Sequence, residues 1–284
     1  MRKRVSILAL VVMTIGAAPG SRTVQAATPA ANEAEAAEQT FYTLSSNIAG
    51  TNSDLWAIEV TGNRVTTTDI GSTGGCGSLA VSPSGMLLSM CGPLFGTQQL
   101  GTLDPRTGHA AVFGVPVPGL AVMSMTFGPD GTLYAVGDCN PGGATFDCGG
   151  GPADPNYNSL YTVNQATGAF TRIGSTGAPE YFMDLTFDRE GNLLGVTTTL
   201  LPSYVPAVLY RINVHTGAAT QIAILVGSNT LMGLGLGRDG KLYANDFVFN
   251  PGLYVIDPKT GLETAIASLP MPLPSSVKLA KPIP

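Results

Sequence analysis

Two glycine positions recur along the chain at one fixed separation, and this spacing constrains the fold more than any other feature. The first glycine closes turns such as QATG at Gly168, and the second closes turns such as DREG at Gly191. Four copies share a separation of 23 residues: Gly62 and Gly85, Gly108 and Gly131, Gly168 and Gly191, Gly217 and Gly240. Equal spacings with matched flanking patterns indicate a repeat architecture.

The clearest copy is Leu160–Val196, which divides into four short strands. Apolar and polar residues alternate in LYTVN and AFTRIG, and MDLTF and NLLGV follow after turn-forming residues. We interpret the copy as one small antiparallel sheet. Such a sheet needs neighbours stacked against it, because it cannot bury both of its faces alone.

The two ends of the chain predict a closed ring. A fifth copy begins at Leu253, but the chain ends before its fourth strand, and a spare strand, Phe41–Leu44, precedes the first copy. The expected fold is therefore all-β, a β-propeller of five four-stranded blades in which the N-terminal strand closes the last blade. Val277 and Leu279 are one place out of register with the other copies, so we expect a bulge there.

Composition agrees with many short strands and turns, since the 284 residues include 36 Gly and 21 Pro and only 12% are charged. A β-sandwich does not predict the constant repeat. An open solenoid does not need a missing strand at one end and a spare strand at the other.

The first residues resemble an export signal. A basic start is followed by the apolar run Val5–Ile15 and by Val24-Gln25-Ala26, which resembles a signal-peptidase site. The run is shorter than the ~20 residues of a spanning helix. The expected domains are a signal peptide (1–26), a flexible lead-in (27–38) and one propeller (39–284). We expect an exported protein, periplasmic or extracellular, with no membrane insertion after cleavage of the signal.

The charge balance excludes one class of partner. The formal net charge is −5, and removal of residues 1–26 leaves ten basic and 19 acidic residues, a balance of −9. No basic patch is present, so nucleic acid is not an expected partner.

Four cysteines in an exported chain predict two disulfides. Cys76 and Cys91 flank a hairpin that would place them opposite each other, and Cys139 and Cys148 bracket a long loop. A metal or redox thiol site is the alternative, but the spacing fits no zinc pattern.

Binding usually resides in variable loops on a constant scaffold. In this repeat, length varies in the links that follow each fourth strand, and these share a face with the loops between second and third strands. The candidate face contains residues 138–158, 175–184, 198–207, 226–232 and 245–250.

Several side chains on this face are candidate ligand-binding groups. Glu180 and Asp184 flank Tyr181, and a carboxylate pair could transfer protons or bind a cation; a solvated loop acid beside a strand-end acid is the alternative. Asn245 and Asp246 begin the last range of the face.

Two further candidates are Asp138, on the same face, and Arg211, in a strand. Asp138 begins an oxygen-rich loop that could hold Ca²⁺, although the loop lacks the order of a known calcium motif and its residues are also typical of turns. Arg211 lies in a first strand, expected to be innermost, where it could hold a ligand carboxylate in the channel or form a salt bridge on the blade surface.

Histidine is expected on the other face. His109 and His215 both lie at first turns, away from the variable loops. A Ser-His-Asp triad or a His metal cluster on the candidate face is therefore not expected.

The pattern LYxIxxxTGxxTxIG followed by LxFxxxGxLYA resembles the repeat of secreted bacterial β-propeller proteins of unknown function. More distantly it is similar to gluconolactonase-like, virginiamycin B lyase-like and YVTN surface-layer propellers. The matching positions are scaffold ones: Leu160, Tyr161, Thr167, Gly168, Ile173, Gly174, Leu185, Phe187 and Gly191. The enzymes among these relatives use carboxylate, Asn or His ligands on the loop face, and no such set matches here residue by residue, so their activities do not transfer.

These observations favour a non-catalytic binding or surface-interaction propeller that uses its variable loop face, with an unknown protein or small molecule as partner. The alternative is a metal-dependent hydrolase or lyase acting on a sugar derivative or lactone at the central channel. A structural coat protein, the third hypothesis, would have no pocket of ligand size. Apart from Ca²⁺, no cofactor is expected.

Overall fold

The computed structural model describes residues 38–46, 52–94, 96–139, 157–198, 206–227, 230–246, 252–270 and 274–279, all within the unit Glu35–Pro284. Residues 1–37 lie outside this part, so the signal peptide and lead-in stay predictions. Among the described residues no helix is long and apolar enough to cross a membrane.

The described strands form five antiparallel sheets of four strands each. Blade 1 contains β4 (Cys76–Val81), β5 (Leu87–Cys91), β6 (Gln99–Leu103) and β7 (Ala110–Val112). Blade 2 contains β8 (Leu120–Phe127), β9 (Leu133–Cys139), β10 (Ser159–Val163) and β11 (Phe170–Ser175). Blade 3 contains β12 (Tyr181–Phe187), β13 (Leu193–Thr198), β14 (Val208–Ile212) and β15 (Ala219–Ile224). Blade 4 contains β16 (Leu231–Leu236), β17 (Leu242–Asp246), β18 (Gly252–Ile256) and β19 (Glu263–Ser268). Blade 5 contains β20 (Pro274–Leu279), β1 (Gln39–Ser46), β2 (Ser53–Thr61) and β3 (Arg64–Ser72).

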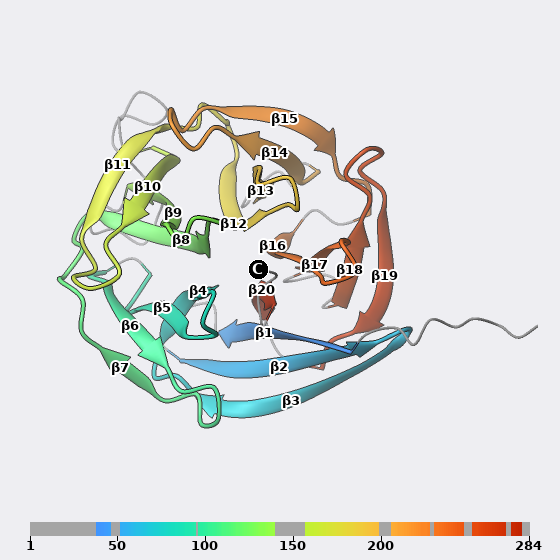
Figure 1. Ribbon diagram of the computed structural model, residues 1–284, viewed down its shortest axis with the longest axis horizontal. Coiled ribbons are helices and arrows are strands. Elements are labelled where there is room, and N and C mark those ends of the chain that lie inside the picture. Colours follow the sequence, from blue (N-terminus) through green and yellow to red (C-terminus); the bar gives the residue numbers. More distant parts are fainter. Residues whose placement is uncertain are drawn as a thin grey trace, which may run out of the picture. The chain divides into compact units, whose positions relative to one another are not determined.

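The five blades are arranged in a ring, which confirms the predicted propeller (Figure 1). The strands β4, β8, β12, β16 and β20 contact one another around the axis, and β3, β7, β11, β15 and β19 form the outer rim. In each blade the first strand of the sheet thus faces the centre of the ring.

The strand pairing that closes the ring is the predicted one. The N-terminal β1 pairs with β2 on one side and with the C-terminal β20 on the other. The expected irregularity is present, because the register between β1 and β20 shifts between Tyr42 and Leu44. The other four innermost strands carry a comparable shift against their neighbours, so the bulge is a feature of the repeat.

The predicted blade boundaries are wrong by two strands. The copy Leu160–Val196 contains β10 and β11, which end blade 2, and β12 and β13, which begin blade 3. Alternation of apolar and polar residues marks strands but does not say which strands pair, so a cyclic repeat can be divided at any strand. The repeat unit therefore spans the junction between two blades.

The apolar core lies between blades. The five larger clusters of buried residues in the described structure are each drawn from two adjacent blades. One example joins Leu160 of blade 2 to Phe182 and Tyr210 of blade 3, whose rings meet edge to face at 5.5 Å. Tyr161 and Tyr210, which occupy the same position in successive copies of the repeat, thus both pack between blades.

The first-turn glycines allow neighbouring blades to approach closely. Gly217 has φ of 81°, and a Cβ there would collide with the backbone of Gly174 on the outer strand of blade 2. Next to it, the N–H of Ala219 donates to the carbonyl of Thr176 at 2.8 Å. The glycine is required both for the left-handed turn and for this contact.

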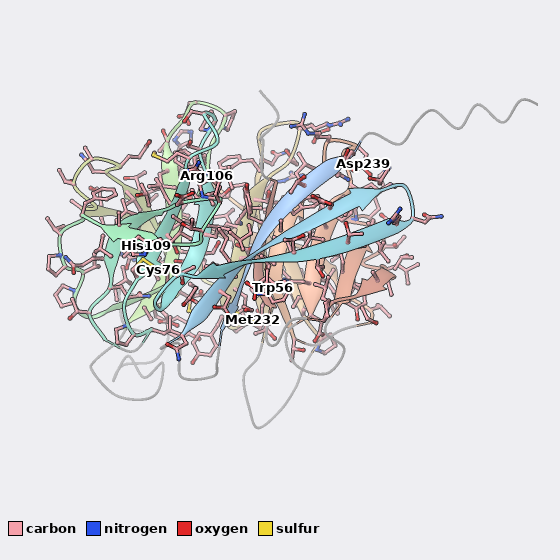
Figure 2. All side chains as sticks on the ribbon, turned by 90° about the horizontal axis from the view of Figure 1, so that it is seen from below. Trp56, Cys76, Arg106, His109, Met232 and Asp239 are labelled. Carbon is pink, nitrogen blue, oxygen red and sulfur yellow. A yellow bond between two sulfur atoms is a disulfide. The ribbon has the colours of Figure 1, made fainter. Side chains whose placement is uncertain are left out.

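The ring has two distinct faces. Tight turns join the first and second strands of a blade, and the third and fourth, on what we call the turn face; the remaining connections lie on the loop face. Figure 2 shows Arg106 and Asp239, both in tight turns, toward one face and Met232 toward the other.

Candidate functional site

A buried ion pair lies at the axis of the ring. Asp184 on β12 is fully buried, and its Oδ1 accepts a hydrogen bond from Lys278 Nζ on β20 at 2.6 Å. The two residues lie in different blades and are 94 positions apart. The pair therefore connects blade 3 to the blade that closes the ring.

The Asp184 carboxylate also gathers donors from other blades. Its Oδ1 accepts from the Ser124 hydroxyl of blade 2 and from the N–H of Leu185 at 2.9 Å. Its Oδ2 accepts from the N–H of Leu234 in blade 4 at 2.7 Å and from the N–H of Val277 at 3.3 Å. One side chain thus bonds to four blades, and both of its oxygens are occupied by donors.

The lysine is equally occupied. Besides Asp184, Nζ of Lys278 donates to the carbonyls of Leu185 and, at 3.3 Å, Leu234. An ammonium group has three N–H donors, so all of them have acceptors. Burial lowers the pKa of Lys278, and the Asp184 carboxylate acts in the opposite direction.

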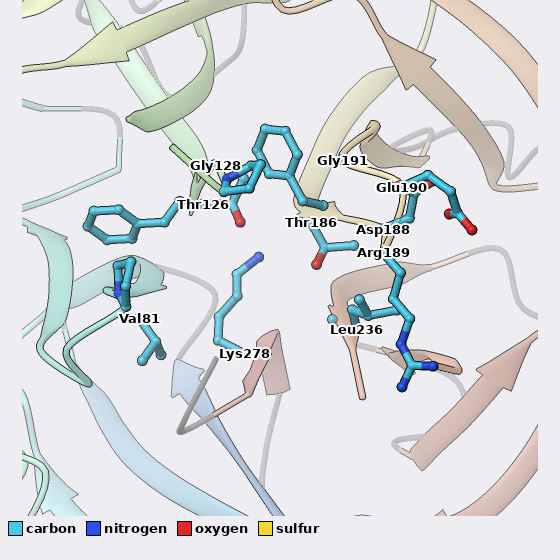
Figure 3. Close-up of a pocket in the computed structure, with 15 residues that line it drawn as sticks. Val81, Thr126, Gly128, Thr186, Asp188, Arg189, Glu190, Gly191, Leu236 and Lys278 are labelled. Atoms are coloured by element: carbon cyan, nitrogen blue, oxygen red, sulfur yellow. The ribbon is translucent and has the colours of Figure 1, made fainter. Parts of the chain in front are cut away.

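Above this pair lies a cavity of about 420 Å³ on the axis. Its floor contains Lys278 and the hydroxyls of Thr126 and Thr186, all pointing toward the centre of the ring (Figure 3). Its walls are formed largely by apolar side chains, among them Phe127 and Phe187. The cavity combines an apolar wall with a small set of polar groups, which is typical of small-molecule sites.

The cavity opens on the turn face, between the turns of blades 1, 2 and 3. Asp188, Arg189 and Glu190 contribute to its rim. Asp188 accepts from the N–H of Asn192 at 2.7 Å and from its side-chain amide at 2.8 Å, and Arg189 donates to the carbonyl of Arg238. The charges of Asp188 and Arg189 are therefore engaged in holding the turns.

The structure separates the predicted carboxylate pair. Asp184 points to the axis, whereas Glu180 accepts a hydrogen bond from the Tyr210 hydroxyl on the third strand of blade 3 at 2.8 Å. Burial, followed by the hydrogen bond and charge of Glu180, raises the pKa of Tyr210. The two acids have different partners, and Asp184 is not a loop residue.

Glu180 instead lies near other residues of the loop face. Asp138, at the end of β9, is buried, and its Oδ1 accepts from the N–H of Asn158 at 3.4 Å. Tyr157 and Tyr181 have ring centroids 6.1 Å apart. Burial raises the pKa of Tyr157 to about 12, with smaller contributions from Tyr181, Asp138 and Glu180. Asp138, Glu180 and Tyr181 are thus close to Tyr157, on the face that was expected to carry the site.

The remaining candidates do not join either group. Arg211 lies on β14, the third strand of its blade, and is exposed; the prediction of an innermost strand is wrong because the repeat was divided at the wrong place. Asn245 and Asp246 are buried at the end of β17. Asp246 accepts from the Thr230 hydroxyl at 2.9 Å, and Asn245 donates to the Thr43 hydroxyl at 3.4 Å.

The first predicted disulfide is present, with 2.02 Å between the sulfur atoms of Cys76 and Cys91 on β4 and β5. Cys139 is the last residue of β9, and Cys148 lies outside the described residues, so the second disulfide stays a prediction.

The oxygen-rich loop that could hold Ca²⁺ stays untested, because its residues 140–156 lie outside the described part. Across the ranges that the structure describes, no three His, Cys, Asp or Glu side chains are grouped so as to hold a metal ion. His109 and His215 are exposed beside first turns, on the turn face as predicted.

Lys278 was missed by sequence reasoning, although the repeat contains a signal for it. The equivalent positions, paired with the same place on the second strand, are Ala80, Thr126, Thr186 and Gly235. A charged residue at a position that is small or neutral in every other copy marks an exception to the scaffold.

No family model and no curated protein matches the sequence. Solved structures with a similar fold include a gluconolactonase from Xanthomonas campestris, with 14% identity over 85% of this chain and 90% of that one and a TM-score of 0.47. A virginiamycin B lyase from Staphylococcus aureus has 15% identity over 84% and 77% of the two chains and a TM-score of 0.43. A PQQ-bound aldose sugar dehydrogenase from Streptomyces coelicolor has 12% identity over 86% and 90% and a TM-score of 0.49. At these identities the likeness concerns the fold alone.

Proposed function

We propose that this protein is an exported binding module and that the axial cavity on the turn face is its ligand site. The observation that carries the proposal is a cavity of about 420 Å³ whose floor charge, Lys278, is buried and bonded to Asp184 and to the surrounding backbone. A charged group whose donors or acceptors are all engaged stabilises the surrounding structure. It is not poised to transfer a proton or attack a substrate.

The location of the cavity supports this role. It lies at the centre of five blades, so its walls are fixed by the packing of the whole ring. A preformed pocket lowers the entropic cost of binding, because little has to be ordered when the ligand arrives. The Cys76–Cys91 disulfide agrees with an oxidising, extracytoplasmic compartment.

The test is a screen of small fragments against the full chain by ligand-observed NMR, repeated with Thr126→Leu, which places a larger apolar side chain at the cavity floor. The matched control is Thr171→Leu, an exposed strand position on the rim of blade 2. We expect the binding of fragments seen with the native protein to be lost in Thr126→Leu and kept in Thr171→Leu. Fragments that are insensitive to Thr126→Leu would contradict the assignment of the site.

The second candidate function is a hydrolase or lyase acting on a sugar derivative or lactone from the loop face. The approach of Asp138 and Glu180 to the buried Tyr157 is the observation that favours it. Turnover of such a substrate that disappears with Glu180→Gln, but not with Glu190→Gln on the turn face, would establish this function in place of binding at the axis.

A further inference from the structure

We propose that the axial cavity selects neutral ligands that carry an amide, hydroxyl or carbonyl group at one end of an apolar body. This inference rests on the proposed function and specifies the chemistry of the same site. It follows from the charge balance at the floor, the free hydrogen-bonding capacity of two threonines and the apolar walls.

The floor is neutral as a unit. The side chains of Lys278 and Asp184 are 6% and 0% exposed, and their charges are separated by 2.6 Å. An anionic ligand would find no donor on Lys278, because its three N–H groups already bond to Asp184, Leu185 and Leu234. A cationic ligand would meet the ammonium group directly. At the floor, either charge would lose water without gaining a partner, which is strongly unfavourable.

The polar groups at the floor suit a neutral ligand. Thr126 and Thr186 come from equivalent positions of adjacent blades and face the axis beside Lys278 (Figure 3). A hydroxyl group can both donate and accept a hydrogen bond. Two hydroxyls can therefore bind the carbonyl and the N–H of one amide without any net charge. They can equally bind the O–H donor and the oxygen acceptor of one alcohol.

The walls and the rim complete the selection. Val81, Phe127, Phe187 and Leu236 line the cavity between floor and mouth, and they would contact an aromatic or aliphatic body. At the mouth Arg189 is already bonded to the carbonyl of Arg238, so it does not offer a preformed anion site. The cavity thus presents neutral polar groups inside and apolar surface along its sides.

Three probes that differ in charge and share one ring test the inference: benzamide, benzoate and benzylamine, titrated into the full chain at neutral pH with chemical-shift or calorimetric detection. We expect benzamide to bind about tenfold more tightly than either charged probe. The double substitution Thr126→Val and Thr186→Val should weaken benzamide about threefold to tenfold. The exposed pair Thr171→Val and Thr220→Val, which is the matched control, should leave its affinity unchanged.

The outcomes separate the two proposals. Binding of benzoate or benzylamine as tight as that of benzamide, still lost with Thr126→Leu, would overturn the selection by charge and leave the binding site in place. An affinity for benzamide that is unchanged by the double substitution Thr126→Val and Thr186→Val would overturn the assigned contacts. A lack of response to all three probes, together with fragments insensitive to Thr126→Leu, would overturn both the selection and the proposed function.

Discussion

Asp184→Asn should destabilise the ring far more than its isosteric character suggests. Every described partner of this carboxylate is a donor, with Ser124, Leu185 and Lys278 on one oxygen and Leu234 and Val277 on the other. An amide has one NH₂ group, and either orientation of the Asn side chain turns that group toward N–H donors, those of Leu185 and Lys278 or those of Leu234 and Val277. The substitution also leaves the Lys278 ammonium buried without its counter-charge.

The magnitude follows from that burial. Removal of one partner from a buried ion pair costs about 3–5 kcal/mol. With a urea dependence near 3 kcal/mol per molar, expected for a chain of this size, the unfolding midpoint should fall by about 1–1.7 M. Lys241→Met is the control, because the ion pair of Lys241 with Asp239, at 3.3 Å, is largely exposed and contributes at most about 1 kcal/mol.

The assay is urea unfolding followed by the fluorescence of Trp56, the single tryptophan, which lies on β2 of the closing blade. The double variant Asp184→Asn with Lys278→Met should be more stable than the two single effects would predict, since it removes both charges. A midpoint for Asp184→Asn as close to the native value as that of Lys241→Met would refute the account of the axial pair.

Three further predictions concern the scaffold. Gly217→Ala should destabilise the protein by at least about 1 kcal/mol more than Gly131→Ala in thermal melts, since both glycines have φ near 80° but only the first packs against the preceding blade; equal effects would contradict the contact. Replacing Cys76 and Cys91 together by Ala should cost about 3 kcal/mol in urea unfolding, because the bridge closes a loop of 15 residues; an unchanged midpoint would argue against that contribution. Tyr157→Phe should flatten the loss of stability between pH 10 and about 12, because a raised pKa stabilises the native state below the ordinary tyrosine value and this contribution disappears as pH rises; an unchanged slope would show that Tyr157 is not the titrating group.

The fold could be predicted from the sequence because it depends on local signals repeated many times. The equal spacing from Gly62 to Gly85 and from Gly168 to Gly191 gave the number of blades, and the spare strand at Phe41–Leu44 gave the closure. The blade boundaries could not be predicted in the same way, because a tight turn and a longer link can each join paired strands. For the same reason Arg211 lies on the third strand of its blade and not on the expected innermost strand.

The candidate site was harder to predict because its residues differ from those at the same positions in the other copies of the repeat. Position by position, Asp184 corresponds to Ser78, Ser124 and Gly233, so one acid and, at Lys278, one base occupy axial positions that are otherwise small or neutral. Their complementarity could have been noticed in the alignment. The cavity above them depends on side chains from several blades, and no local pattern encodes such a space.

The pairing of β1 with β20 has a consequence for the order of events during synthesis. A ribosome delivers β1 before the other strands and β20 after them, so blade 5 cannot be completed until the other four blades have emerged. Asp184 is made 94 residues before Lys278, so until β20 arrives its carboxylate has the donors Ser124, Leu185 and Leu234 but no counter-charge. Pairing of β20 with β1 and neutralisation of the axial carboxylate therefore belong to one late step, and a nascent ring without β20 retains an uncompensated charge at its axis.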